Sequence, residues 1–302
     1  MKKILIIGGT GFIGYHVAIR AIKKNWKVTS ISSTKPKKNR LLTQVKYLKC
    51  NISKKSEIEK KLKNLKFDYI VNLGGHVDHS EKRKTYSSHF IGFRNLIDYF
   101  EKKNINSFIQ AGSSVEYGFN KSPHNERMKC LINKKTSVYG KSKIFSTKLG
   151  LKIFKDSNFP ITILRFYLVY GPRQDKNRFI PIIIDGCLKD KNFNCSSGDQ
   201  VRDFIYIDDV IDVIFKVFKN TKAKGHIFNI GSGKKIKLKK IIEYIREYLN
   251  SGKPQYGLVK LRKDEPLNLY PSITKAKKYL SWKPKTKFLK GVIKTIKYYK
   301  NG

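Results

Sequence analysis

The chain has 302 residues, of which 40% are hydrophobic and 12% aromatic, and this composition excludes an intrinsically disordered protein. Lys and Arg number 65 against 22 Asp and Glu, giving a formal net charge of +43, which often marks proteins that bind nucleic acid or anionic membranes. The lysines are spread along the whole chain instead of gathering in one tail or helix face, so we expect neither nucleic acid nor a membrane as the partner. A basic surface should still attract anionic substrates such as nucleotide diphosphates.

The cysteines and the start of the chain predict a reduced, cytoplasmic protein. Cys50, Cys130, Cys187 and Cys195 lie far apart, without a C-x-x-C pair or a zinc spacing, so we expect no metal site. The first apolar run stops at Gly8, which is too short for a signal sequence or a membrane span.

Buried-strand patterns and helical periodicities alternate through the first half of the chain. Strands are predicted at residues 3–7, 28–32, 69–73, 107–112 and 161–166, and helices at 15–25, 57–65, 90–103 and 138–154. This order predicts an α/β fold with a Rossmann-type doubly wound parallel sheet. From about residue 170 the rhythm changes, and segments 202–210, 226–233 and 237–249 predict a smaller C-terminal α/β substrate lobe. We expect a dinucleotide-binding domain at 1–168 and the substrate lobe at 169–302, with an approximate boundary and some C-terminal segments returning to the first domain.

A glycine-rich turn follows the first predicted strand and opens the first predicted helix. Residues 8–14, Gly-Gly-Thr-Gly-Phe-Ile-Gly, satisfy both G-x-G-x-x-G and G-x-x-G-x-x-G. In that context the early glycines permit close backbone approach to a pyrophosphate, and the helix end attracts its charge. The predicted contacts to the pyrophosphate are Gly8, Gly11, Phe12, Ile13 and Gly14.

Hydroxyl side chains stand at the end of the second predicted strand, where NAD-binding folds carry an Asp or Glu for the ribose 2′-hydroxyl. Ser32 and Ser33 occupy this place, Lys35 follows, and no acidic residue precedes Glu57. Because a carboxylate would repel a 2′-phosphate whereas hydroxyls and cations bind it, NADP(H) is favoured as the cofactor, with NAD(H) as the alternative.

Tyr139 and Lys143 are four residues apart and therefore share one face of a predicted helix. A phenol has an unperturbed pKa near ~10, and a nearby ammonium stabilises its phenolate and brings it into a useful range. Ser113 and Ser114 follow a predicted strand, at the edge where parallel sheets place ligand-contacting residues.

These motifs, in this order, resemble the extended short-chain dehydrogenase/reductase family of nucleotide-sugar epimerases, dehydratases and reductases. The resemblance covers nearly the whole chain. Its motifs lie at residues 8–14, Asn51-Ile52, Asn72-Leu73-Gly74-Gly75, 112–118, Tyr139 with Lys143, 164–165, 169–173, 202–209 and 229–233.

The resemblance implies roles for individual residues. Tyr139 is expected as the acid/base, Lys143 as the group that holds the nicotinamide ribose and tunes Tyr139, and Ser113 as the hydrogen-bonding partner of the reacting oxygen. Further expected contacts are Asn51, Ile52, Leu73 and Gly74 to the cofactor, and Ser114, His76, Arg202 and Arg262 to the substrate. Structural or solvated roles stay open for His76, for its neighbour His79 and for both arginines. A homodimer formed through helices that include the one bearing Tyr139 is also implied.

Three comparisons with the motifs of this family indicate which reaction to expect. Family dehydratases usually carry Thr-Asp-Glu-Val before the residue that matches Tyr117, and there the Asp and Glu eliminate water. Here residues 113–116 read Ser-Ser-Val-Glu, so both elimination carboxylates are missing and Glu116 is interpreted as structural. Leu168 stands where many epimerases and dehydratases carry an Asn against the sugar or diphosphate. The Gly-Ser-Ser-x-Glu-Tyr-Gly form of residues 112–118 is similar to that of reductases such as CDP-abequose synthase.

The preferred hypothesis is therefore NADPH-dependent reduction of the C4 ketone of a nucleotide-linked 4-keto-6-deoxysugar, as in deoxysugar synthesis for surface polysaccharide. An NAD-dependent nucleotide-sugar 4-epimerase is the alternative within enzymes. A non-catalytic dinucleotide- or RNA-binding protein is the third hypothesis.

Overall fold

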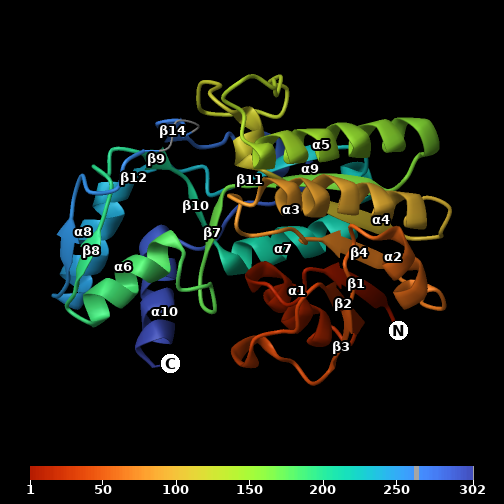
Figure 1. Ribbon diagram of the computed structural model, residues 1–302, viewed down its shortest axis with the longest axis horizontal. Coiled ribbons are helices and arrows are strands. Elements are labelled where there is room, and N and C mark those ends of the chain that lie inside the picture. The colour runs from red at the N-terminus through yellow and green to blue at the C-terminus, as the bar shows by residue number, and fades with distance from the viewer. Residues whose placement is uncertain (262–264, 302) are drawn as a thin grey trace.

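Seven parallel strands form the main sheet of the computed structural model, which describes residues 1–261 and 265–301. Their order is β11-β6-β5-β4-β1-β2-β3, so the direction of winding reverses between β1 and β4 (Figure 1). The predicted Rossmann-type α/β fold is confirmed. The strands are β1 (Lys3–Ile7), β2 (Lys27–Ser32), β3 (Val45–Lys49), β4 (Tyr69–Asn72), β5 (Ser107–Ser113), β6 (Ile161–Phe166) and β11 (Ile227–Ile230).

Helices cover both faces of this sheet. Helix α1 (Phe12–Ile22) and helix α7 (Ile207–Phe218) pack together on one face, and α2 (Lys55–Leu62), α4 (Gly92–Phe100) and α5 (Val138–Ser157) lie on the other (Figure 1). A short helix α3 (Lys82–Tyr86) and a π turn (Ser87–Ile91) lead into α4 and contact α5.

Side chains that alternate along β1 supply apolar groups to the helix layers on both faces of the sheet. Ile4 and Ile6 belong to the cluster under α1 and α7, whereas Leu5 and Ile7 belong to the cluster under α2 and α4. Successive strand residues point to opposite faces, so an uninterrupted apolar strand is what a sheet covered on both sides requires.

The smaller lobe lies at the other end of the molecule (Figure 1). Its elements are β7 (Leu168–Tyr170), α6 (Phe179–Leu188), β8 (Asn192–Asn194), β9 (Val201–Arg202), β10 (Phe204–Tyr206), β12 (Ile236–Lys237), α8 (Leu238–Leu249), β13 (Lys253–Gln255), β14 (Asn268–Leu269) and α10 (Phe288–Lys300). Three short sheets, β10-β7, β12-β9-β14 and β13-β8, organise it. One apolar cluster runs from Ile4 of the main sheet through Tyr170 to Ile296 of α10, so the two lobes share a core.

The prediction that residues 226–233 belong to the smaller lobe is wrong. Strand β11 pairs in parallel with β6 and extends the main sheet, with Phe228 and Ile230 fully buried. Likewise α7, which includes the end of the 202–210 segment, packs against α1 and β5, and α9 (Thr274–Leu280) packs against β11. An apolar run predicts a strand but not its partner, because the partner lies far away in the chain.

Two local predictions also need correction. Strand β3 was not predicted, since its sequence Val-Lys-Tyr-Leu-Lys is short, basic and placed at the sheet edge, where only one residue, Val45, is buried. The predicted helix at 90–103 is instead the π turn followed by α4, which ends at Phe100.

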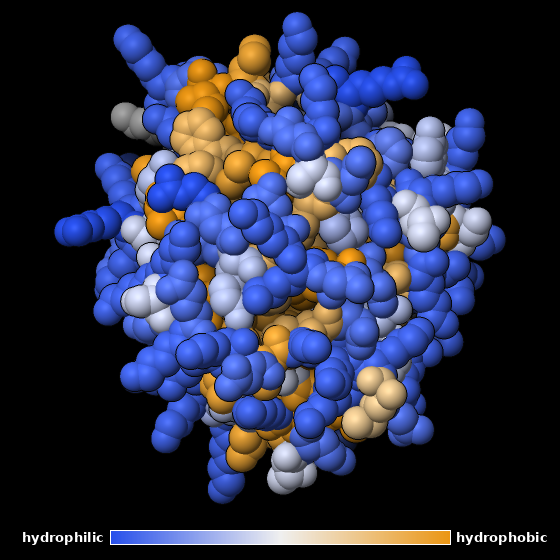
Figure 2. Space-filling view, turned by 90° about the vertical axis from the view of Figure 1, so that its right-hand side faces the viewer, coloured by the Kyte–Doolittle hydropathy of each residue, from blue (hydrophilic) through white to orange (hydrophobic). Residues whose placement is uncertain are grey.

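Hydrophilic side chains cover most of the face shown in Figure 2, interrupted by separate apolar areas. The four cysteines form no disulfide. Within residues 1–261 and 265–301, no helix has the length and apolar character needed to span a membrane.

Candidate active site

The glycine turn joins β1 to α1 beside the reversal in strand order. A Cβ on Gly14 would lie 2.4 Å from the Gly8 carbonyl oxygen, so α1 can approach the turn only with glycine there. A Cβ on Gly11 would meet only that same oxygen, at 3.3 Å, and otherwise open space. No side chain caps α1, and its first turn holds no acidic residue. The first helical N–H groups and this open approach fit a dinucleotide pyrophosphate.

The structure adds a carboxylate to the neighbourhood of the predicted 2′-phosphate site. Ser32 is half-buried at the end of β2, and Ser33 and Lys35 are exposed. Further along this loop, Lys37 and Arg40 lie 2.7 and 3.1 Å from Asp175, which the sequence places far away. Two cations that follow Lys35 are therefore already paired, and the Ser32 hydroxyl donates to the Ile31 carbonyl at 2.8 Å.

The remaining predicted cofactor residues lie around the ends of β3 and β4. Ile52 is buried between Gly74 and Gly92, where a Cβ on either glycine would come within 4 Å of its side chain. The Asn51 side chain accepts a hydrogen bond from the Ser53 N–H at 3.0 Å. Leu73 and Gly74 are half-buried directly after β4.

Ser113 ends β5 and is held by a buried carboxylate. Its N–H donates to Glu116 Oε1 at 2.8 Å, and its hydroxyl accepts from Val115 N–H at 3.4 Å. Glu116 is fully buried and also accepts from Thr147 of α5 at 2.7 Å and from Arg165 of β6 at 2.9 Å. These contacts fit the prediction that Glu116 has a structural role, because its carboxylate binds the Ser113 N–H, Thr147 and Arg165.

Tyr139 and Lys143 lie on the first turns of α5, facing the end of β5. Lys143 is buried, and its Nζ donates a hydrogen bond to the Ala111 carbonyl at 2.7 Å. The same Nζ lies 5.7 Å from the centre of the Tyr139 ring. Burial lowers the pKa of Lys143 to about 8, although the Glu116 charge opposes this shift. Burial raises the pKa of Tyr139, and a hydrogen bond with Ser113 opposes that rise. The structure thus brings Ser113, Tyr139 and Lys143 together.

Two histidine rings enclose the Tyr139 ring. His79 stacks on it with ring centres 3.8 Å apart and planes 13° apart, and His89 meets it edge-on at 4.9 Å. Burial, helped by the Lys143 charge, lowers the pKa of His89 to about 2, so this imidazole is neutral. His89 Nε2–H donates to the His76 carbonyl at 3.1 Å, while Nδ1 is buried without a partner among the described residues.

His89 was not among the residues predicted from the sequence. It lies in the π turn before α4, and the helix predicted there started one residue later. π turns often occur at functional sites but have no simple sequence pattern, so only the fold reveals that this side chain faces Tyr139.

The predicted substrate residues do not form a single group. Ser114 is buried in the turn after Ser113, and the His76 ring pairs with Glu81 at 3.1 Å. The Arg202 guanidinium donates to the Leu267 carbonyl at 2.9 Å and pairs with Glu265 at 2.6 Å. Arg262 lies outside the described residues. Arg178, at the start of α6, was not predicted, yet its charge acts to lower the pKa of Tyr139 and so places a cation of the smaller lobe near the site.

Comparison with known proteins shows the family of the chain. A sequence model of the NAD dependent epimerase/dehydratase family matches residues 4–231, and the chain belongs to this family. The resemblance recognised from the motifs is therefore confirmed, and the protein is an enzyme of a nucleotide-sugar epimerase/dehydratase family.

Individual relatives match almost end to end. An uncharacterized UDP-glucose epimerase of Bacillus subtilis is 28% identical over 315 residues, covering 98% of this chain and 97% of its own. A CDP-abequose synthase of Salmonella muenchen is 27% identical over 303 residues, with 98% and 97% covered. The crystal structure of UDP-glucose 4-epimerase from Thermotoga maritima with UDP-glucose is similar with a TM-score of 0.92, 24% identity and 99% of both chains covered, a likeness of fold.

Replacing Gly11 with Ala should separate binding from folding. The added methyl group projects into the open space of the turn, so we expect the thermal midpoint to stay near that of the wild type while dinucleotide affinity falls by about tenfold or more. Titration calorimetry with NADP⁺ and NAD⁺ measures this. Gly14→Ala is the contrasting variant, expected to lose stability because its methyl group meets the Gly8 carbonyl. Wild-type affinity in Gly11→Ala would show that the pyrophosphate binds elsewhere.

Removing the Glu116 carboxylate should destabilise the protein strongly. Glu116→Ala leaves the Arg165 charge buried without its partner, and breaking a buried ion pair in this way costs about 3–5 kcal/mol of unfolding free energy. Urea unfolding measures the change. Glu101→Ala, at the exposed residue that follows α4, is the control and should change stability by less than about 0.5 kcal/mol. Equal stability of the two variants would contradict the structural interpretation.

Proposed function

We propose that this enzyme transfers a hydride at C4 of a nucleotide-linked sugar, and that its reaction is reduction of the C4 ketone of a 4-keto-6-deoxysugar with NADPH. The observation that carries the proposal is the cluster of Ser113, Tyr139 and Lys143 at the end of β5. A nicotinamide dinucleotide, when bound, would supply the hydride, and the protein must then supply a proton and orient the ketone.

Tyr139 is placed to supply that proton. Because its pKa is raised, its hydroxyl stays protonated at neutral pH and can donate to the C4 oxygen as that oxygen gains negative charge. The Lys143 ammonium stabilises the phenolate that this transfer leaves behind. The Ser113 hydroxyl, fixed through the Glu116 contact to its N–H, donates to the same oxygen and orients it.

Dehydration is disfavoured by the same geometry. The one carboxylate in the turn after β5 is that of Glu116, which is fully buried and occupied by Arg165, Thr147 and the Ser113 N–H. A carboxylate held in this way is not available to remove a proton from the substrate. The serines at the end of β2 and Lys35 support NADPH, which a reductase consumes in each turnover.

A 4-epimerase is the second candidate. The Bacillus subtilis relative is named a UDP-glucose epimerase and the Thermotoga maritima structure a UDP-glucose 4-epimerase. The same three residues can take a proton from a C4 hydroxyl and later return it. The two candidates differ in whether the cofactor is consumed. An epimerase keeps NAD bound and shows no net redox change.

Purified protein should therefore be mixed with a nucleotide-linked 4-keto-6-deoxysugar while the absorbance of reduced nicotinamide is followed. We expect NADPH to be oxidised in proportion to the ketosugar added, and faster than NADH. We would also identify the cofactor that remains bound after purification. Absence of oxidation with either cofactor, together with tightly bound NAD and interconversion of UDP-hexoses, would replace the reductase proposal with the epimerase.

Tyr139→Phe should remove most turnover while substrate and cofactor binding survive. Loss of a positioned general acid costs roughly 10²–10⁴-fold in rate. Calorimetric binding and steady-state rates of the same preparation separate the two effects. Tyr256→Phe is the matched control, because its hydroxyl donates to Glu243 of α8 in the smaller lobe, outside the Ser113 cluster. Unchanged turnover in Tyr139→Phe would exclude this proton donor.

The pKa of Lys143 predicts an alkaline limit to the reduction. Because this pKa is lowered to about 8, the ammonium is present below pH 8 and lost as the pH rises through it, while Tyr139 with its raised pKa stays protonated. The rate should therefore fall above pH 8. Lys143→Arg keeps its charge over this range and should lack that fall, whatever its absolute rate. The same alkaline fall in both proteins would contradict the assignment.

We also propose a homodimer formed through α5 and the segment before α4. Phe90 and Phe145, half-buried neighbours 5.5 Å apart, give this surface an aromatic pair suited to contact with a second copy. Light scattering of the purified protein measures the assembly.

A further inference from the structure

The acidic residues of the chain end well before its last helix. Residues 266–302 hold ten lysines, no arginine and none of the 22 Asp and Glu residues. The even spread of the lysines argued against a membrane as the partner, but the acidic residues are not spread evenly. The positive charge of this segment is therefore not offset by acidic neighbours in the sequence. Helix α10 is the longest helix of the segment.

One face of α10 carries exposed lysines that form a lysine stripe, namely Lys290, Lys294, Lys297 and Lys300. Their spacings of four, three and three residues place them on the same side of the helix. The opposite side is buried, and it consists of Gly291, Val292, Thr295 and Ile296. With a rise of 1.5 Å per residue, the lysine stripe extends over about 15 Å.

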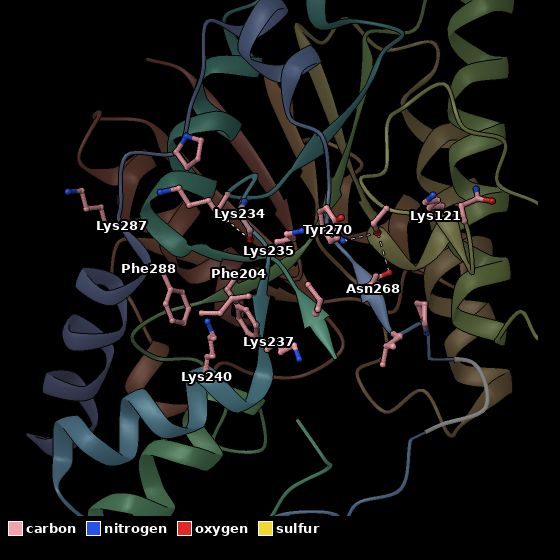
Figure 3. A pocket seen from close by; sticks show the side chains of 18 of the residues that line it. Lys121, Phe204, Lys234, Lys235, Lys237, Lys240, Asn268, Tyr270, Lys287 and Phe288 are labelled. Atoms are coloured by element: carbon pink, nitrogen blue, oxygen red, sulfur yellow. Dashed lines mark hydrogen bonds between the residues drawn. The ribbon is translucent and has the colours of Figure 1, made fainter. Parts of the chain in front are cut away.

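Aromatic contacts fix the start of α10 to the smaller lobe. The Phe288 ring lies 5.5 Å from the Tyr170 ring and 6.0 Å from the Phe204 ring, and the Tyr170 hydroxyl donates to the Phe288 carbonyl at 3.0 Å. Phe288 and Lys287 also line a cavity of about 1090 Å³, around which other loops place further lysines (Figure 3). No lysine of the stripe lines this cavity. The helix continues beside α6 to the C-terminus, so the stripe is a separate surface (Figure 1).

The charges of the lysine stripe are not neutralised within residues 1–261 and 265–301. None of the ion pairs there includes a lysine of the stripe. Like charges three or four residues apart on a helix repel one another. The helix dipole favours Lys297 and Lys300 in the last turn, but it disfavours Lys290 in the first turn. A bound anionic surface would relieve both effects.

We propose that the lysine stripe binds the surface of an anionic lipid bilayer. Clusters of four or more lysines on a helix are attracted to acidic phospholipids, and their apolar stems let the ammonium groups reach the headgroups. Leu289, which is 49% exposed, precedes the stripe and adds an apolar side chain suited to the interface. The segment lacks arginine, the residue that nucleic-acid sites use for paired contacts to bases, so lipid is favoured over nucleic acid.

Co-sedimentation of the full protein with lipid vesicles tests the proposal. We expect vesicles of phosphatidylcholine with about 30% phosphatidylserine to bind the protein at least about tenfold more tightly than vesicles of phosphatidylcholine alone. Added salt should weaken this binding, because it screens exposed charges. Equal binding to the two kinds of vesicle, or no binding to either, would overturn the proposal.

The variant Lys290→Glu with Lys297→Glu removes the net charge of the stripe. Each new carboxylate lies three or four residues from Lys294 or Lys300, so the helix gains favourable pairs and folding is preserved. Its affinity for the phosphatidylserine vesicles should fall by about tenfold or more. Wild-type affinity in this variant would contradict the assignment of the surface.

A matched variant separates the lysine stripe from the general charge of the protein. Lys277→Glu with Lys278→Glu, exposed on α9, makes the same change in net charge outside the stripe and should leave vesicle binding unchanged. An equal loss in both variants would show non-specific attraction and overturn the proposal.

Single-stranded RNA distinguishes a lipid surface from a nucleic-acid surface. We expect polyuridylate to bind the wild type and the stripe variant with similar affinity, because the general charge of the protein attracts it. A loss of polyuridylate binding in the stripe variant larger than its loss of vesicle binding would assign the stripe to nucleic acid and overturn the membrane proposal.

Discussion

The buried ion pair between Glu116 and Arg165 is the interaction on which the geometry of the candidate active site depends. Its carboxylate joins three elements at once, since it receives hydrogen bonds from the end of β5 at Ser113, from Thr147 of α5 and from Arg165 of β6. Ser113 is carried by the first of these elements and Tyr139 with Lys143 by the second. A buried carboxylate is stable only when hydrogen bonds and an opposite charge satisfy it. The partners of Glu116 must therefore stay in place, which makes the local geometry rigid.

Burial governs the chemistry of the residues around this pair. Burial lowers the pKa of Lys143, keeps His89 neutral and keeps Tyr139 protonated, so the site brings a protonated phenol and a readily titrated ammonium together. Proton transfer at neutral pH requires groups whose surroundings shift their pKa values. Elsewhere the net charge of +43 and the uncapped start of α1 favour the binding of anionic groups.

Much of the fold was predictable because its signals are local. The apolar runs of β1, β4, β5 and β6, the glycine turn, and the spacing of Tyr139 and Lys143 are all readable from neighbouring residues. Strand β3 could not be predicted, because a short basic edge strand lacks an apolar run. The pairing of β11 with β6 could not be predicted either, because strand pairing depends on residues far away in the chain. His89 was missed for a related reason, since a π turn shifts the helical face by a residue and no local pattern announces it.

The amino-acid sequence by itself determined the family, the glycine-rich turn and the identity of the three catalytic candidates, because glycine spacing and helical periodicity act over a few residues. Tertiary structure alone decided which charges are available. It paired Lys37 and Arg40 with Asp175, occupied Arg202 with Glu265, enclosed Tyr139 between His79 and His89, and gathered lysines from distant loops around one cavity. Electrostatic partners act through space, so the availability of a charge is a property of the folded chain.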